Sequence, residues 1–239
     1  MNLIKLIILI ISCFIIFGSE IYIYFFKNRF PLIYGIKEGC CQFNFSADRL
    51  PLSRINGGLE FTISLWIYIA SWEYKYNQEK VILYWKGKSM KDEFILNSKS
   101  SLALGKCLEL EGGVSLDLLK KKSMIGKYGG LKIYLHPKKN NLVVEYSLMD
   151  GSKEKISIKN IPLQKWVNVI ALLRLRNLDI FINGALIANK FLKGVPLYGR
   201  HKLLIDPKGG FDGYISNIVY YNRALKYPEI KAIFKKGKN

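Results

Sequence analysis

Aromatic and basic side chains are interleaved over a short stretch in the first half of the chain. The aromatic ones are Trp72, Tyr74, Tyr76 and Trp85, and the basic ones are Lys75, Lys80 and Lys86. Flat ring faces combined with a few convergent polar groups are typical of sites that bind sugars. The stretch therefore predicts a carbohydrate-binding site. The competing interpretation is that Trp85 belongs to the core and that the tyrosines are ordinary loop residues.

A second basic group lies in residues 111–130, a segment with two glycine pairs and no clear strand pattern. Its members are Lys120, Lys121, Lys122 and Lys127. Long excursions between strands often carry binding residues. We interpret this group either as a surface for an acidic glycan or as a solvated loop.

The whole chain is strongly basic. Lysine and arginine number 37 against 18 aspartate and glutamate residues, which gives a formal net charge of +19. This charge favours anionic partners such as acidic glycans, acidic membrane surfaces or nucleic acids, and it does not choose among them. An AT-rich genome would impose a similar excess of lysine. The sequence has none of the motifs of sequence-specific nucleic-acid binding, so that class of partner is not expected.

The cysteines and histidines lack the spacing of a metal site. The four cysteines are Cys13, Cys40, Cys41 and Cys107. Adjacent cysteines seldom bridge each other, so in an oxidising compartment either Cys41 or Cys40 could pair with Cys107. His136 and His201 are far apart in the chain, and we interpret them as ordinary loop or strand-end residues.

From residue 42 onward, short apolar or alternating runs are separated by turn signals, as is typical of an antiparallel sandwich. The clearest run covers residues 59–69, where every second residue is large and apolar. Further strands are predicted at residues 80–85, 102–108, 131–135, 142–148, 155–158, 166–173, 178–182, 186–190, 202–205 and 214–221. Asn183-Gly184 and Asp150-Gly151 predict two-residue hairpin turns of type I′. One helix is predicted at residues 228–234, because it begins with a proline at an early helical position.

The N-terminal region is strongly apolar. Residues 6–26 are long enough to span the hydrocarbon core of a bilayer. Glu20 is the one costly residue in this stretch and would sit best near an interface. A cleaved signal peptide is the alternative, but Ile16 or Phe17 then falls where a cleavage site needs a small side chain. We therefore favour an uncleaved membrane anchor.

Charge alone does not orient this anchor. Lys5 on one side opposes Lys27 and Arg29 on the other, a near balance that leans towards a cytoplasmic C-terminus. The sequon beginning at Asn44 favours the outside instead, and so does the predicted disulfide. We expect a single-pass membrane protein whose folded domain lies on the extracytoplasmic or virion-exterior side.

Four stretches resemble the laminin-G-like members of the concanavalin A-like lectin and glucanase superfamily. They are residues 60–66 (EFTISLW), 162–169 (PLQKWVNV), 178–184 (LDIFING) and 211–225 (FDGYISNIVYYNRAL), the last followed by Glu229-Ile230. Their order and spacing carry the resemblance, and the final stretch is the most distinctive. The resemblance implies an all-β, two-sheet antiparallel jelly-roll sandwich with a short C-terminal helix, behind an N-terminal transmembrane helix. The expected division is an anchor at 1–29, a linker at 30–41 and a sandwich domain at 42–239.

Members of this superfamily include lectins, adhesion modules and glycosidases, so the fold alone does not fix the function. The glucanases place catalytic carboxylates at alternate positions of one strand, and a retaining mechanism needs the two carboxyl groups about 5–5.5 Å apart. Glu109 and Glu111 are the nearest match, but the third acid is missing, so no catalytic residue is assigned. The resemblance also makes calcium a candidate cofactor, with Asp206 and Asp212 as conceivable ligands.

These observations predict a membrane-anchored, non-catalytic carbohydrate-binding or adhesion module that favours anionic glycans. The alternative is a structural or assembly protein of a viral envelope or cell membrane, in which the sandwich contacts a protein partner. A glycoside hydrolase is the least favoured of the three classes.

Overall fold

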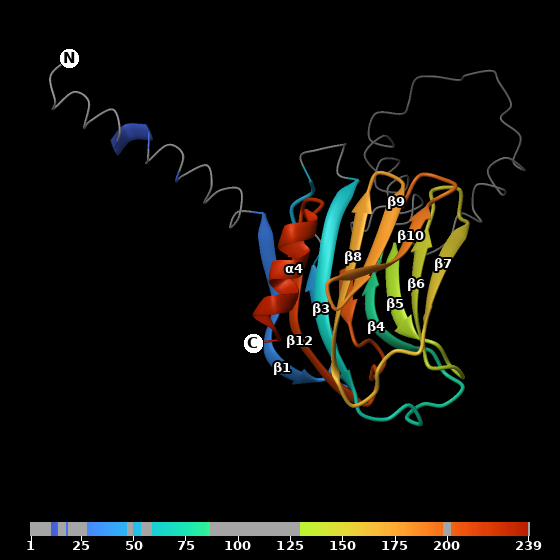
Figure 1. The fold of residues 1–239 in the computed structure, drawn as a ribbon. Coiled ribbons are helices and arrows are strands. Elements are labelled where there is room, and N and C mark those ends of the chain that lie inside the picture. Colours follow the sequence, from blue (N-terminus) through green and yellow to red (C-terminus); the bar gives the residue numbers. More distant parts are fainter. Residues whose placement is uncertain are drawn as a thin grey trace, which may run out of the picture.

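Two antiparallel sheets packed face to face form the body of the protein, and one helix, α4 (Tyr227–Lys236), lies against the outer face of the first sheet (Figure 1). This computed structural model describes residues 11–13, 18, 28–46, 50–53, 59–86, 130–197 and 202–238. The prediction of an all-β, two-sheet antiparallel sandwich with a short C-terminal helix is confirmed.

In the described part of the chain each sheet has six strands. In spatial order the first sheet contains β1 (Arg29–Glu38), β12 (Gly213–Tyr221), β3 (Glu60–Ile69), β8 (Trp166–Arg174), β9 (Asn177–Ile182) and β10 (Ala185–Phe191). The second sheet contains β2 (Phe43–Ser46), β11 (Lys202–Ile205), β4 (Lys80–Trp85), β5 (Leu131–Leu135), β6 (Asn141–Ser147) and β7 (Lys153–Lys159). Because β12 lies between β1 and β3, the last strand joins the N-terminal part of the chain to the centre of the first sheet.

Strand β3 is buried on both of its faces. Its inward side chains are Phe61, Ile63, Leu65, Ile67 and Ile69, which alternate along the strand as predicted and lie in the main core. Thr62, Ser64 and Trp66 point to the other face, and they are buried as well. Because the second face of β3 is also buried, another layer of the protein must cover it. Helix α4 forms part of that layer.

Helix α4 has its own small hydrophobic core on the outer face of the first sheet. Ile230 is fully buried there, in a cluster with residues of β8, β9 and β12. The segment leading into the helix is fixed by Thr62, whose hydroxyl donates to the Arg223 carbonyl oxygen (2.9 Å) and accepts from the Leu225 N–H (3.1 Å). Pro228 lies in the first turn, where its missing N–H costs no helical hydrogen bond. The predicted helix is confirmed.

The two predicted hairpin turns differ in conformation. Asn183 and Gly184 both have positive φ, 51° and 77°, as a type I′ turn between β9 and β10 requires. In the turn between β6 and β7, Gly151 has a φ of 88° and Asp150 is not among the positive-φ residues. Asp150 Oδ1 instead accepts a hydrogen bond of 2.8 Å from the Ser152 N–H. The turn is therefore present, but the type I′ assignment is wrong.

Residues 30–41, predicted as a linker, are mostly part of a strand. β1 pairs with β12 along its length as the edge of the first sheet, with two register shifts. Pro31 and Gly35 obscure this strand in the sequence, because proline and glycine weaken a strand interior and are tolerated at edges and bulges. The sandwich therefore begins upstream of the predicted boundary at residue 42.

The predicted anchor lies largely outside the described residues. Residues 11–13 and Gly18 are helical, and no helix within the described ranges is both long and apolar enough to cross a membrane. The predicted strand at 102–108 also falls outside these ranges. A membrane anchor over residues 6–26 remains a prediction.

Replacing Trp85 by alanine should lower the free energy of unfolding by about 3–5 kcal/mol, because the indole fills the centre of the sandwich. Its ring makes edge-on contacts with Phe61 and Tyr220, both at 5.2 Å between ring centroids. Denaturant unfolding of the full chain in mild detergent measures the change. The exposed Tyr76→Ala is the control and should change stability by less than about 0.5 kcal/mol. Equal losses in the two variants would contradict the assignment of Trp85 to the core.

Candidate functional site

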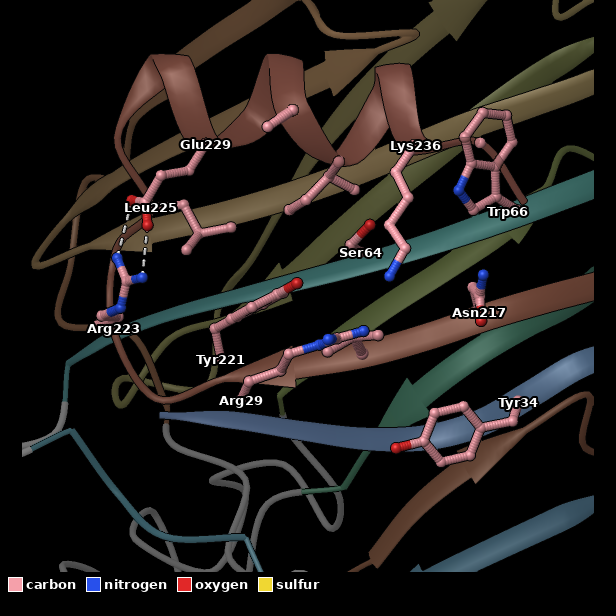
Figure 2. A pocket seen from close by; sticks show the side chains of 14 residues that line it. Arg29, Tyr34, Ser64, Trp66, Asn217, Tyr221, Arg223, Leu225, Glu229 and Lys236 are labelled. Atoms are coloured by element: carbon pink, nitrogen blue, oxygen red, sulfur yellow. Dashed lines mark hydrogen bonds and ion pairs between the residues drawn. The ribbon is translucent and has the colours of Figure 1, made fainter. Parts of the chain in front are cut away.

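A pocket of about 420 Å³ opens between α4 and the outer face of the first sheet (Figure 2). We call it the α4 pocket. Strands β1, β12 and β3 form its floor, and α4 with its lead-in segment forms the opposite wall. Its polar and aromatic lining residues are Arg29, Tyr34, Ser64, Trp66, Asn217, Tyr221, Arg223, Glu229 and Lys236.

Three basic side chains and one carboxylate give the α4 pocket a net positive charge. Arg223 forms a two-point ion pair with Glu229, with Nη1–Oε2 and Nη2–Oε1 distances of 2.8 and 2.5 Å. This pair holds the pKa of the Glu229 carboxyl below its ordinary value. Arg29 and Lys236 form no ion pair with any carboxylate in the described ranges. Two positive charges are therefore available to an anionic ligand.

The two available cations come from different walls of the pocket. Arg29 is the first residue of β1, and its Nε is buried without a hydrogen-bond partner in the described chain. Lys236 is in the last turn of α4, and its side chain points towards Ser64 on β3 (Figure 2). The guanidinium also has a side-chain hydrogen bond with Tyr221. An anion between the sheet and the helix would accept hydrogen bonds from the accessible N–H groups of Arg29 and from the Lys236 ammonium.

The strands under the pocket depart from regular pairing. In β12 the register against β3 shifts between Ser216 and Val219, and Asn217 has a φ of 42°. The register of β1 against β12 also shifts, between Ile33 and Ile36, and Gly35 there has a φ of 65°. Bulges re-aim side chains and are common beside functional sites. Here they lie next to Tyr34 and Asn217, which both line the pocket.

Aromatic rings close one end of the α4 pocket. Trp66 stacks on Phe234 of α4, with ring centroids 5.9 Å apart and an interplanar angle of 16°. Phe234 in turn lies against the β9–β10 turn, where a Cβ added to Gly184 would come within 3.3 Å of its side chain. Tyr34 stands at the rim and exposes 66% of its surface. The pocket thus combines two cations, hydrogen-bonding groups and aromatic surface.

The predicted sugar site around residues 72–86 is only partly assembled. The prediction that Trp85 belongs to a surface site is wrong, because this side chain lies in the main core. Trp72 is half-buried against that core, with the Lys80 ammonium 4.7 Å from its ring centroid. Lys86 follows the other end of β4 from Lys80, roughly 20 Å away along the strand. These residues do not converge on one ligand.

Tyr74, Lys75 and Tyr76 do lie together, in a turn that precedes β4. The Tyr74 hydroxyl and the Lys75 ammonium both donate to the Gly209 carbonyl oxygen, each at 3.0 Å. Lys75 also donates to the carbonyl oxygen of Lys208. These contacts tie the turn to the loop that follows β11, so two of the three predicted ligand-binding side chains have a structural role. Tyr76 is exposed.

Several other predicted residues lie outside the described ranges. They are Lys120, Lys121, Lys122, Lys127, Glu109, Glu111, Cys107 and His201. Cys40 and Cys41 are exposed and free in the described part of the chain. Because Cys107 lies outside that part, the disulfide between Cys41 and Cys107 remains a prediction. Asn44 lies on β2 with an exposed side chain, which leaves the predicted glycosylation site accessible. His136 Nδ1 accepts from the N–H groups of Lys138 and Lys139, consistent with its interpretation as a loop residue.

The predicted calcium ligands are in different environments. Asp206 is fully buried, and neither of its carboxyl oxygens has a hydrogen-bond partner. Asp212 is exposed. Among the described residues, the only three potential metal ligands close to one another are Glu38, Cys40 and Cys41, and all three are exposed. Asp206 and Asp212 therefore do not form a ligand cluster of that kind.

The α4 pocket was not predicted from the sequence. From the sequence, Arg29 was considered only as a charge that flanks the predicted anchor, and Trp66 only as part of the strand resemblance. The available signal was the polar and aromatic outer face of residues 62–68 combined with an amphipathic helix at residues 228–234. A helix that must cover a strand carrying a serine and a tryptophan creates such a lined space.

Solved structures of botulinum neurotoxin binding domains share this fold. The serotype D domain superposes with a TM-score of 0.53 at 12% identity, covering 87% of this chain and 43% of that one. The serotype G domain gives 0.50 at 13%, covering 87% and 46%. The DC domain, solved in complex with SialylT, gives 0.51 at 15%, also covering 87% and 46%. At these identities the likeness shows the β-sandwich fold alone, and the chain spans under half of each matched chain.

No family model matches the chain, and no curated protein matches it.

Asp206→Asn should stabilise the protein increasingly as the pH rises. Burial raises the pKa of the Asp206 carboxyl to about 9, whereas the unfolded carboxyl ionises near pH 4. Folding therefore takes up a proton at neutral pH, and the free energy of unfolding falls between about pH 4 and pH 9. The asparagine variant avoids this loss, which amounts to about 1.4 kcal/mol for each pH unit between these limits, so at pH 8 it should be more stable than the wild type by several kcal/mol.

Denaturant unfolding of the two proteins at pH 5, 6.5 and 8 measures the effect. The exposed Asp212→Asn is the matched control and should follow the wild-type profile. Parallel profiles for wild type and Asp206→Asn would show that the buried carboxyl is compensated. Added calcium tests the cofactor prediction, since a metal bound by Asp206 would stabilise the wild type and leave the asparagine variant unchanged.

Proposed function

We propose that this protein is a non-catalytic carbohydrate-binding module with a concanavalin A-like, laminin-G-like jelly roll, and that it binds an acidic glycan in the α4 pocket. The proposal rests on which basic side chains of the pocket have a carboxylate partner and which do not. Arg29 and Lys236 lack carboxylate partners in the described chain, whereas Arg223 is already neutralised by Glu229. A carboxylate or sulfate group between Arg29 and Lys236 would make charge-assisted hydrogen bonds to both.

Other groups in the pocket suit a sugar better than a bare ion. Ser64 and Asn217 can exchange hydrogen bonds with sugar hydroxyls, and Tyr34 at the rim offers exposed ring surface. A neurotoxin binding domain that shares the fold was solved in complex with SialylT. That complex supports a glycan as the first ligand class to examine.

Lys236→Gln should weaken acidic-glycan binding about tenfold, because a hydrogen bond to a charged group contributes about 1.5–3 kcal/mol. Arg29→Gln should weaken it at least as much. The matched control is Lys231→Gln, which removes the same charge from an exposed position of α4 that does not line the pocket. A glycan array probed with the full chain in detergent, at low and high salt, measures all four proteins. Thermal unfolding checks that each variant is folded.

Binding to carboxylated or sulfated glycans that salt weakens, and that depends on Lys236 and not on Lys231, would support the proposal. Binding to neutral glycans alone, or equal losses in the Lys231 and Lys236 variants, would refute a role for the pocket. Binding to no glycan would shift the assignment to a structural or assembly protein.

That assembly function has one observation in its favour. β10 is an edge strand of the first sheet, and it exposes three large apolar side chains, Leu186, Ile187 and Phe191. Exposed apolar edges are sites where another chain can pair. Sedimentation of the full chain in detergent would support assembly if it gave an oligomer that Ile187→Lys dissociates.

We also propose that residues 6–26 anchor the sandwich to a membrane with its binding face outside the cytoplasm. The accessible side chain of Asn44 on β2 is compatible with glycosylation in the secretory pathway. Expression in a eukaryotic cell should then give a glycosidase-sensitive increase in mass that Asn44→Gln abolishes. A domain that is protected from protease inside intact cells and carries no glycan would contradict this orientation.

A further inference from the structure

A second, shallower hollow of about 270 Å³ lies on the outer face of the first sheet. It is lined by Ile36, Tyr68, Trp166 and Tyr214, which we call the aromatic platform. Tyr68 is central, with its ring centroid 5.7 Å from that of Trp166 and 5.9 Å from that of Tyr214. Ile36 and Tyr214 expose 47% and 43% of their surfaces. Packed aromatic rings thus remain open to a ligand on this face.

The aromatic platform continues the α4 pocket along the same strands. β3 contributes Trp66 to the pocket and Tyr68 to the platform, and β1 contributes Tyr34 and Ile36 in the same order. Residues two apart on a strand share a face and lie about 7 Å apart. One ligand of more than one sugar ring can therefore reach from the pocket to the platform.

A polar boundary separates the two sites. The Ser216 hydroxyl is within hydrogen-bond distance of the carbonyl oxygens of Gly35 (3.0 Å) and Lys238 (2.7 Å). The Lys238 ammonium lies 4.8 Å from the Trp166 ring centroid. The pocket is thus charged and the platform is mainly aromatic, with the Lys238 backbone between them and the Lys238 ammonium over the Trp166 ring of the platform.

We propose that the α4 pocket and the aromatic platform together bind one acidic oligosaccharide, with the anionic sugar in the pocket and the adjoining neutral pyranose on the platform. The C–H groups of a neutral pyranose pack against ring faces, while the tyrosine hydroxyls can bond to its rim. A lipid surface fits less well, because these rings pack against one another inside a hollow. This inference rests on the proposed function, since it needs the anion site to be correct.

The test compares an acidic monosaccharide with the same sugar extended by neutral rings. The probes are N-acetylneuraminic acid with sialyllactose, and glucuronic acid with a glucuronic acid–galactose disaccharide, with lactose as the neutral reference. Calorimetry on the full chain in detergent should give about tenfold tighter binding for the extended member of at least one pair. Lactose alone should bind more weakly than either acidic sugar.

Tyr214→Ala and Trp166→Ala should remove this gain and leave the affinity for the acidic monosaccharide unchanged within about twofold. Phe191→Ala is the matched control, because it removes an exposed ring from β10 at the opposite edge of the same sheet. It should bind both members of each pair like the wild type.

The outcomes separate this inference from the proposed function. Monosaccharide binding that needs Lys236, without any gain from the neutral ring, would overturn the platform and leave the pocket standing. A gain that survives both Tyr214→Ala and Trp166→Ala would do the same. Binding to none of the sugars would overturn both proposals. So would binding to phosphatidylserine vesicles alone, which would assign this face to an acidic lipid surface.

Discussion

The hydroxyl of Thr62 is the contact on which the outer layer of this protein depends. It joins the central strand β3 to the segment before α4 through two hydrogen bonds in a fully buried position. Leaving buried polar groups unpaired is costly, so the geometry of this junction is strongly favoured. The Arg223–Glu229 ion pair and the apolar cluster around Ile230 then hold the helix over the sheet. The α4 pocket is the space that remains where this covering layer does not reach β1.

Ion pairing elsewhere explains why the charge of the pocket is distinctive in such a basic protein. Glu145 is paired with Lys153 and Lys155 at 3.1 and 3.0 Å, and Glu154 is paired with Lys190 at 2.9 Å. These pairs lie on β6, β7 and β10, towards the other edge of the sandwich. Glu229 is paired with Arg223 in the pocket itself. The other described carboxylates that form ion pairs are used away from Arg29 and Lys236, so these two cations keep their charge without a carboxylate partner in the described part of the chain.

The strands were predictable because their side chains alternate or form short apolar runs between clear turns. β3 shows this best, since its inward residues follow a strict period of two. β1 was missed because Pro31 and Gly35 interrupt its pattern. Trp85 was misplaced because β4 is almost continuously apolar, so the sequence does not reveal which side of that strand faces the core. The outer face of β3 and the amphipathic helix indicated a covered surface, but the residues that line the α4 pocket could not be predicted. Arg29, Trp66 and Lys236 are distant in sequence and meet only through β12 and the docked helix.

Gly184, at the tip of the β9–β10 hairpin, influences the size of the α4 pocket although it does not line it. Gly184 lets the turn approach Phe234, and Phe234 supports Trp66 at the end of the pocket. A larger residue at the turn would displace the phenyl ring, and the indole stacked on it would have to follow. Evolution could therefore resize the pocket from a hairpin that contributes no lining residue, so related chains with identical pocket residues need not accept the same ligand.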